Sequence, residues 1–504
     1  MFKLFSSKPK IIDFPENAEW LNTDKQLSLK SNLKGHVIVL DFWTYCCINC
    51  IHMLTELKPL EEKYKDNQVI FIGIHSSKFT NENNKRNIQS AIERYEITRP
   101  VVIDKDHALW SSYEISGWPT IVVLDTKGNV VHKQSGEGQS QSLDAVIEAT
   151  LQKEKSEKRL SLLKIDLKQK LVQKKTTLSF PSKIEYSEVF SQLFIVDSNH
   201  NRILATQLDD TKAYIVQQIG SGEIGFEDGP FEKAKFNHPQ GIARKRDILY
   251  IADTENHAIR LADLKQKTVK TIVGNGQQAR GSPKRGKGVE TALNSPWDLL
   301  IHQSFLFIAM AGSHQIYKLD LMTHEIEPYA GTGEEGIRDG LKNTALFAQP
   351  SGLDSDGEFL YIADSETSSI RAINFKTGYV STLIGKGLFE FGNKEGKFEE
   401  TLLQHCIGIY YNEGLLYIAD TYNNSIKVAY LNSDKVIKII GTDENNPKVC
   451  MINEGKMVSC NELPLYEPND VIVVKNKLLI ADTNNHLIRI FDMNKKTLKD
   501  LQII

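Results

Sequence analysis

The chain has 504 residues, 40% of them hydrophobic and 25% charged, which is typical of globular protein and long enough for at least two folding units. Its formal net charge of −3 and its lack of a basic region argue against nucleic acid as a partner, and no apolar run approaches the roughly 18 residues that span a bilayer. Because residues 1–20 lack the apolar core of a secretory signal and six cysteines are too few for a secreted disulfide framework, we expect a cytoplasmic protein that does not bind membranes.

The first part of the chain alternates continuous apolar runs with helical patterns. Strands are predicted at 36–42, 69–74 and 101–103, helices at 51–66, 83–95 and 142–155, and a final antiparallel hairpin at 121–124 and 130–131. Continuous apolar runs are typical of strands that are buried on both faces. This order predicts an α/β domain with a mixed sheet over residues 1–155.

The candidate chemistry lies between the first strand and the first helix, where Cys47 and Cys50 form a Cys-x-x-Cys pair. A helix N-terminus stabilises a thiolate through its N–H groups and its dipole. We therefore expect Cys47, at the helix start, to be the exposed nucleophile and Cys50, one turn further along, to be the resolving thiol. Zinc binding is the weaker interpretation, because His52 alone lies near the thiols and no second ligand pair follows. We expect neither a metal nor a cofactor.

Two motifs accompany the cysteine pair. Asp41-Phe42-Trp43 ends the first strand, and Trp118-Pro119-Thr120 precedes the hairpin. With these motifs the segment resembles the thioredoxin-like family, in the branch that has an inserted helix and strand before the terminal hairpin. The resemblance implies that Pro119 is cis and faces the dithiol, and that Asp41 accepts a proton from Cys50. The alternative for Asp41 is a strand-end carboxylate with a purely structural role.

The sequence departs from that family at the residues around the dithiol. Ile48 and Asn49 stand between the cysteines in place of Gly-Pro, so the redox potential and the direction of electron flow do not carry over. Cys46 occupies the position where the family usually has Trp. It is either a third redox thiol or a small buried apolar residue, and we favour the second interpretation.

A third option for the site is thiol peroxidase chemistry. Trp43, Thr44 and Trp118 are expected near the dithiol, and Thr44-x-x-Cys47 places a hydroxyl three residues before a thiol. The peroxiredoxin pattern also has Pro four residues before that Thr, and here Leu40 stands there. We therefore rank peroxidase chemistry below disulfide exchange.

A lysine-rich stretch, predicted to be a charged linker over residues 156–178, leads to a second segment with internal repeats. Six similar apolar lines recur at intervals of 54 to 62 residues, and their fifth positions are Asp197, Asp253, Met310, Asp364, Asp420 and Asp482. A short apolar strand precedes each line, and a turn with two further strands follows it. In the sixth repeat the last of these strands is expected at residues 501–504. Four strands repeated six times predict a six-bladed β-propeller over residues 179–504.

The repeats resemble a known family. The hallmark of the NHL repeat, Tyr-Ile-Ala-Asp-x-x-Asn-x-x-Ile-Arg, is matched best at residues 417–427 and 479–489. A thioredoxin-like domain with Trp-Thr-Tyr-Cys-Cys-Ile-Asn-Cys at 43–50, followed by an NHL propeller, is similar to the NHL repeat-containing protein 2 family and its bacterial relatives over nearly the whole chain. That family usually carries a further C-terminal β domain. We expect this chain to lack it, because its repeats continue to the last residues.

The repeated polar residues have a structural interpretation. The consensus aspartates are expected to accept hydrogen bonds from backbone N–H groups of the turn that follows each line. Arg260, Arg371 and Arg489 are expected to pair with acidic groups between blades. Met310 replaces the aspartate in the third blade, which predicts an altered loop geometry and a functional rim there.

The loops between blades carry repeated Gly-x-Gly, at 220–222, 274–276, 331–333 and 385–387. No helix follows that could bind a phosphate, so these glycines are predicted to serve turns. The last cysteines are predicted to be structural: Cys406 in the core, and Cys450 and Cys460 as two free thiols, with a local disulfide as the alternative.

Two functions are compatible with these features. The first is a cytosolic thiol–disulfide oxidoreductase whose propeller binds or positions a protein substrate through the rim formed by its loops. The second is an interaction protein in which the propeller is the functional part and the first domain is a docking module. The sequence names neither the substrate nor the oligomeric state.

Overall fold

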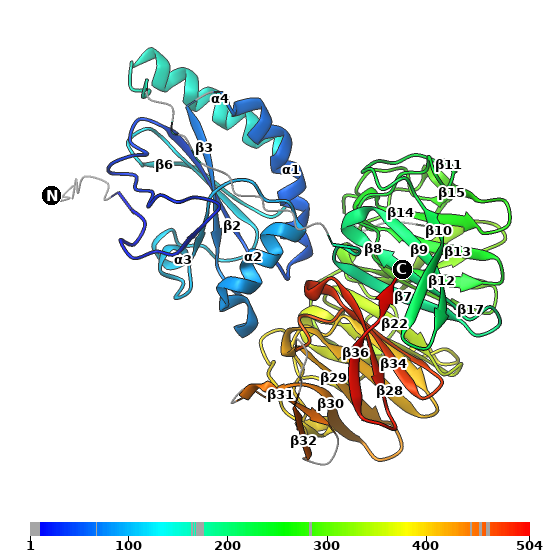
Figure 1. The fold of residues 1–504 in the computed structure, drawn as a ribbon. Helices are drawn as coiled ribbons and strands as arrows, with labels where there is room; N and C mark the ends of the chain where they lie inside the picture. The colour runs from blue at the N-terminus through cyan, green and yellow to red at the C-terminus, as the bar shows by residue number, and fades with distance from the viewer. Residues whose placement is uncertain are drawn as a thin grey trace. The chain divides into compact units, whose positions relative to one another are not determined.

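The computed structural model describes residues 11–66, 68–162, 165, 167, 176–281, 285–443, 446–452, 456–459 and 464–504. The chain divides into two compact units, residues 1–174 and 175–504. Figure 1 draws the first unit in blue to cyan, with helices against a sheet, and the second in green to red, built of strands. The finer boundaries, with a linker over 156–178, stay a prediction. None of the described helices is both long and apolar enough to cross a membrane.

The first unit is built on a six-stranded mixed sheet in the order β1-β4-β3-β2-β5-β6. The strands are β1 (Trp20–Leu21), β2 (Val37–Trp43), β3 (Val69–His75), β4 (Val101–Ile103), β5 (Thr120–Leu124) and β6 (Val130–Ser135). β2 runs parallel to β3 and antiparallel to β5. All predicted strands are present; β1 was not predicted, because two residues show no periodicity.

Helices cover both faces of this sheet. They are α1 (Ile48–Tyr64), α2 (Lys85–Arg94), α3 (Ala108–Ser112) and α4 (Ser140–Ser156), with the 3-10 helix η1 (Thr80–Asn83). Met53 of α1 and Leu143 of α4 pack on Val37 and Val39 of β2, while Leu109 of α3 belongs to the core on the opposite face. α1 begins three residues before its predicted start, so its cap is Cys47.

Part of the predicted linker packs on the first unit. Ser161 N–H donates to Gly35 O at 2.8 Å, and Ile165 and Leu167 lie against the core. At the C-terminal end of the predicted linker, Leu178 is buried in the core of the second unit. Residues 163, 164, 166 and 168–175 lie outside the described residues.

The second unit is the predicted six-bladed propeller, with four main strands in each blade. Blade one consists of β7 (Pro181–Ser187), β8 (Gln192–Asp197), β9 (Arg202–Asp209) and β10 (Lys212–Ile219), and blade two of β12 (Ile242–Lys245), β13 (Ile248–Asp253), β14 (Ala258–Asp263) and β15 (Thr268–Val273). Blade three consists of β17 (Pro296–His302), β18 (Phe305–Met310), β19 (Gln315–Asp320) and β20 (Glu325–Ala330), and blade four of β22 (Pro350–Ser355), β23 (Phe359–Asp364), β24 (Ser369–Asn374) and β25 (Tyr379–Ile384). Blade five consists of β27 (Gly408–Asn412), β28 (Leu415–Asp420), β29 (Ser425–Tyr430) and β30 (Lys435–Asp443), and blade six of β33 (Asp470–Val474), β34 (Lys477–Asp482), β35 (Leu487–Asp492) and β36 (Thr497–Asp500).

Short outer strands complete these sheets. Blades two to five gain β11 (Gly229–Pro230), β16 (Gly286–Lys287), β21 (Gly340–Leu341) and β26 (Gly396–Lys397), and a hairpin of β31 (Asn446–Ile452) and β32 (Lys456–Ser459) extends blade five. Blade one instead gains β37 (Gln502–Ile503), which lies parallel to β10 with Ala213 opposite Ile503. These last residues were predicted to be the fourth strand of blade six. That was wrong, because β36 is the fourth strand of blade six and β37 closes the ring.

A second set of contacts links neighbouring blades. In each blade the turn after the second strand ends on a residue in the left-handed conformation, whose side chain accepts a backbone N–H of the next blade. Ser295 N–H donates to His257 Nδ1 at 3.0 Å, and Phe180 N–H donates to His486 Nδ1 at 3.1 Å. The last contact joins blade six to blade one, so the ring is closed at two places.

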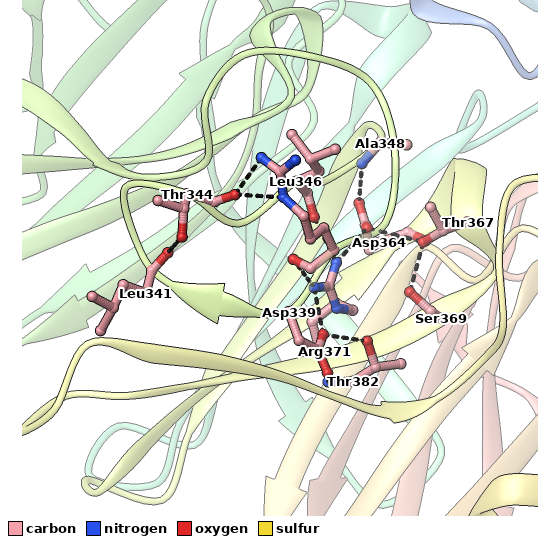
Figure 2. Close-up of polar contacts among 11 residues, drawn as sticks. Asp339, Leu341, Thr344, Leu346, Ala348, Asp364, Thr367, Ser369, Arg371 and Thr382 are labelled. Carbon is pink, nitrogen blue, oxygen red and sulfur yellow. Dashed lines mark hydrogen bonds and ion pairs between the residues drawn. The ribbon is translucent and has the colours of Figure 1, made fainter.

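The repeated acid and base pairs lie within blades, not between them as expected. Arg371 contacts Asp364 of the neighbouring strand and Asp339 of the loop that enters the same sheet, at 3.4 and 3.0 Å (Figure 2). Asp364 Oδ1 accepts the N–H of Ala348, in the segment before the inner strand, at 2.8 Å. Its Oδ2 accepts the hydroxyl of Thr367, in the turn that follows, at 2.9 Å, so the contact with that turn is made by a side chain and not by the expected backbone N–H groups. The same arrangement recurs for Arg260 in blade two.

Blade three replaces the charged pair with Met310 and Tyr317, both buried. The predicted change of loop geometry is wrong: Met310 has φ −92° and ψ 82°, close to the −88° and 79° of Asp253. Asn294 supports the turn instead, because its Nδ2 donates to Gly312 O at 2.8 Å. The functional rim predicted for this blade stays a prediction.

The remaining predictions for the propeller concern glycine and cysteine. Gly274 has φ +105°, and a Cβ there would lie 2.5 Å from His257 O, which confirms the turn role of the Gly-x-Gly loops at this position. Cys406 is buried, as predicted. Cys460 and the side chain of Cys450 lie outside what the structure describes.

Candidate functional site

The two cysteines of the motif lie at the start of α1 but differ in exposure. Cys47 is the cap residue, with extended backbone, and is partly exposed. Cys50 lies in the first turn, where its N–H donates to Cys47 O at 3.0 Å, and its side chain is fully buried. The arrangement therefore offers one thiol to solvent and keeps the other inside.

The environment of Cys50 favours the neutral thiol. Burial raises the pKa of Cys50 well above its usual value, and a hydrogen bond with Cys47 raises it further. The negative charge of Asp41 also raises the pKa of Cys50, while the backbone of Thr44 lowers it. Cys50 thus needs a proton acceptor before its sulfur can act as a nucleophile.

A buried carboxylate, Glu82 of η1, holds the segment before Cys47. Its Oε1 accepts the Thr44 hydroxyl at 2.7 Å and the Cys46 N–H at 3.0 Å. Its Oε2 accepts the N–H groups of Lys78 and Phe79 at 2.8 and 2.9 Å. Glu82 was not predicted as a site residue, because nothing in the sequence pattern around it marks it as buried.

These contacts bear on two earlier expectations. The Thr44 hydroxyl, considered as a partner of the Cys47 thiol in peroxide reduction, donates to Glu82. The Cys46 side chain is 1% exposed, with its Sγ 3.8 Å from Thr44 Oγ1. This placement agrees with the interpretation of Cys46 as a small buried residue.

The Trp118–Pro119 peptide bond is cis, as the resemblance implied. Thr120, the next residue, lies opposite Phe42 in the sheet, so Pro119 lies at the same end of the sheet as the segment that leads to Cys47. Trp118 Nε1 donates to Ser76 O at 2.9 Å, which fixes the indole at this end.

Asp41 lies beneath α1 in a buried ion pair with Arg99, a residue that was not predicted to belong to the site. Its Oδ2 is 2.5 Å from Nη2 of Arg99, and Nη1 of Arg99 is 2.5 Å from Oε1 of Glu61. Burial raises the pKa of Asp41, and Arg99 opposes that effect. Asp41 Oδ1 is buried and has no hydrogen-bond partner among the described residues. One oxygen is therefore structural and the other is available to a proton.

His75, at the end of β3, is a second residue that was not predicted. It is buried, and its ring packs on Tyr45 and Trp43 with centroids 5.6 and 5.1 Å apart. Neither ring nitrogen has a hydrogen-bond partner among the residues that the structure describes. Burial lowers the pKa of His75 to about 3, so the ring is neutral.

His52, the residue considered for zinc, contacts a carboxylate. Its Nδ1 lies 2.5 Å from Glu137 Oε2, in the loop after β6. That loop is also tied to the rest of the site, since Gly136 N–H donates to Pro119 O at 2.9 Å. The described part of the chain contains no group of three or more His, Cys, Asp or Glu side chains that could hold a metal ion.

Fold and site define a protein in which a thioredoxin-like domain precedes a six-bladed β-propeller. The thioredoxin-like family matches residues 35–130. Over 522 residues the chain is 38% identical to NHL repeat-containing protein 2 of Bos taurus, which covers 96% of this chain and 70% of that protein. The chain belongs to the NHL repeat-containing protein 2 family.

Two further relatives share all or part of this architecture. The chain is 41% identical over 506 residues to "Protein SUPPRESSOR OF QUENCHING 1, chloroplastic" of Arabidopsis thaliana, a match of 96% of this chain but only 46% of that protein. The chain thus spans less than half the length of this relative. It is 27% identical over 147 residues to "Thiol-disulfide oxidoreductase ResA" of Bacillus cereus, which covers 29% of this chain and 82% of that protein.

Proposed function

We propose that the chain is a thiol–disulfide oxidoreductase in which Cys47 attacks a substrate disulfide and Cys50 resolves the mixed disulfide. The observation that carries the proposal is the contrast between a partly exposed thiol at a helix start and a fully buried one in the first turn of that helix. The similarity of this region to a protein named as a thiol–disulfide oxidoreductase supports it.

The chemistry proceeds in two exchanges. The Cys47 thiolate attacks one sulfur of the substrate disulfide, forms a Cys47–substrate disulfide and releases the other sulfur as a thiolate, which takes a proton from water. Cys50 then gives its proton to Asp41, and its sulfur attacks Cys47 Sγ. A Cys47–Cys50 disulfide forms and the second substrate thiol leaves. The substrate gains two electrons, and an external dithiol returns the protein to its reduced form.

The propeller's part in this proposal is to bind or position a protein substrate through the loops between its blades. Support comes from the fold, because rigid sheets that present long loops are suited to protein recognition. We propose the cytoplasm as the compartment, in keeping with the low cysteine content. The word "chloroplastic" in the name of one relative refers to that protein.

A trapping experiment tests the redox proposal. In full-length protein, Cys50→Ser leaves the mixed disulfide unresolved, so substrates should accumulate as adducts on Cys47 that dithiothreitol releases. The double variant Cys47→Ser/Cys50→Ser should give no adduct, and Cys406→Ser, which alters a buried propeller cysteine, should behave as the wild type. If the purified wild type reduces no disulfide and Cys50→Ser traps nothing, the proposal fails.

The same variants test the alternative function, in which the chain is an interaction protein and the propeller is its functional part. If Cys47→Ser/Cys50→Ser captures the same non-covalent partners as the wild type and supports the same cellular phenotype, the propeller alone carries the function. Loss of the phenotype with partners retained would support the oxidoreductase.

A further inference from the structure

A row of three charged side chains, two buried and one half-buried, links α1 to the sheet. It runs from Glu61 on α1 through Arg99, just before β4, to Asp41 on β2. In the sheet order, β3 lies between β4 and β2. The Arg99 side chain therefore crosses a whole strand to reach Asp41.

A glycine makes this crossing possible. Gly73 of β3 lies opposite Asp41 on one side and Val101 on the other. A Cβ on Gly73 would lie 3.0 Å from Trp43 Nε1, 3.2 Å from Val101 Cγ2 and 3.6 Å from Arg99 Nε. An isolated glycine within an apolar strand is typical of such a close approach, and here the side chain that approaches is a guanidinium.

The guanidinium is shared between two carboxylates. Nη2 binds Asp41 Oδ2 and Nη1 binds Glu61 Oε1, both at 2.5 Å. The Asp41 and Arg99 side chains are 2% and 4% exposed, whereas that of Glu61 is 17% exposed. Among the described residues, Arg99 is therefore the cation on which Asp41 depends, and Glu61 competes for the Arg99 charge from the side nearer to solvent.

The other elements around Asp41 contribute few charges. β3 presents Gly73, and β5 presents Ile121 opposite Asp41. The titratable neighbours on α1 are Cys50, whose pKa the Asp41 charge raises, Cys47 beside it, and Glu61. Arg99 is thus the one cation among the described residues that acts on Asp41.

We propose that Arg99 is the positioning residue that holds Asp41 as the carboxylate which accepts the Cys50 proton, and that Glu61 weakens this hold. The inference rests on the proposed disulfide exchange, in which Cys50 must lose a proton to attack Cys47 Sγ. The proton passes from Cys50 Sγ to Asp41, the new bond is Cys47–Cys50, and the substrate sulfur leaves as a thiolate.

The arrangement predicts opposite effects of the two outer residues. Without the Arg99 charge, Asp41 keeps its proton to a higher pH, so the pH midpoint of the resolving step rises. Without the Glu61 charge, Arg99 serves Asp41 alone, so the midpoint falls. If Arg99 and Glu61 had only a structural role, loss of either charge would lower stability and would not shift the pH midpoint in opposite directions.

The test uses full-length protein with Cys450→Ser and Cys460→Ser as background, and 5,5′-dithiobis(2-nitrobenzoate) as the disulfide. Attack by Cys47 releases a first equivalent of nitrothiobenzoate, and resolution by Cys50 releases a second, whose rate is followed from pH 4 to pH 9. Arg99→Gln should raise the midpoint of the second rate by about one pH unit or more and slow it about tenfold on the acid side. Arg99→Lys should restore most of the wild-type profile, and Glu61→Gln should move the midpoint downward.

The outcomes separate the inference from the function on which it rests. If the wild type releases both equivalents but the midpoint does not move, or moves the same way in Arg99→Gln and Glu61→Gln, Arg99 has no role in proton transfer. If the wild type releases no second equivalent, the exchange mechanism itself fails and the inference with it. Should Arg99→Gln not fold, Glu61→Gln and Arg99→Lys still decide, because the first must lower the midpoint and the second must leave it near the wild-type value.

Discussion

Lys183 of blade one and Asp298 of blade three form a buried ion pair although their blades are not adjacent, with Nζ 3.2 Å from Oδ2. Nζ also lies 3.5 Å from Asp470 Oδ1 of blade six and donates to Ile407 O at 3.1 Å. Burial lowers the pKa of Lys183, but Asp298 and Asp470 outweigh it, so the net shift is upward. The lysine is therefore a charged link between the inner strands of blades one, three and six and the residue just before the inner strand of blade five.

Removing this link should destabilise the propeller strongly. Lys183→Met leaves Asp298 and Asp470 buried without a counter-charge, which costs about 3–5 kcal/mol. Urea unfolding followed by far-UV circular dichroism measures the loss. The control is Lys265→Met, which breaks an exposed pair with Asp247 and should leave the free energy of unfolding nearly unchanged. Equal costs for the two variants would show that the buried pair is not a main support.

A single charged substitution in the neutral pair of blade three, Met310 and Tyr317, should lower stability more than a double substitution that introduces two opposite charges. Met310→Asp alone buries an unpaired carboxylate and should cost about 3 kcal/mol or more, and the double variant Met310→Asp/Tyr317→Arg should recover part of that loss. The matched cycle in blade four is Asp364→Met, Arg371→Tyr and their combination. Additive costs in both cycles would mean that the two positions act independently.

Glu82 should control access to Cys46. Glu82→Gln places an amide N–H₂ against N–H groups or the Thr44 hydroxyl, and each lost charge-assisted hydrogen bond costs about 1.5–3 kcal/mol. Iodoacetamide labelling of Cys46, read by mass spectrometry, should become at least about tenfold faster as the segment opens more often. Glu62→Gln, at an exposed position of α1, should leave the rate unchanged. Protection of Cys46 in both variants would contradict this role.

His75 should make the first unit sensitive to acid. Its pKa is about 3 in the folded chain and near 6.5 when unfolded, so the unfolded chain binds the proton first and stability falls as the pH drops from about 6.5 towards 3. Between pH 7 and pH 4.5 the loss from this residue is about 2–3 kcal/mol.

The variant His75→Phe should remove that part of the acid sensitivity while keeping a ring against Tyr45 and Trp43. Tryptophan fluorescence in urea reports mainly this unit, because Trp20, Trp43, Trp110 and Trp118 lie in it. His132→Phe, at a half-buried position of β6, is the control. If the wild type and His75→Phe lose stability equally between pH 7 and pH 4.5, the buried neutral ring is not the cause.

Local pattern was enough to predict the architecture. The apolar runs at 36–42 and 69–74 and the recurrence of similar lines in the second segment identified both folds, because strand burial and repeat stacking leave periodic traces in the chain. The dithiol was found for the same reason, since Cys47 and Cys50 are neighbours in sequence. Residue identity alone thus located the candidate chemistry.

Pairing between distant residues left no such trace. Arg99, Glu82 and His75 reach the site from three different segments, and only the folded sheet and loops bring them there. Only Gly73 gave a signal, as a lone glycine in an apolar strand, and its meaning depends on the arginine that passes it. The partner of β37 was misassigned because a short strand does not encode which edge it joins.

The parallel pairing of β37 with β10 has a consequence for the newly made chain. The outer edge of blade one stays open until residues 502–503 have been synthesised, and this edge carries the exposed side chains Tyr214, Ile215 and Val216. An uncovered apolar edge is a template for pairing with other chains. Synthesis therefore includes a period in which the nascent propeller is vulnerable to aggregation, and that period ends only when β37 docks on β10.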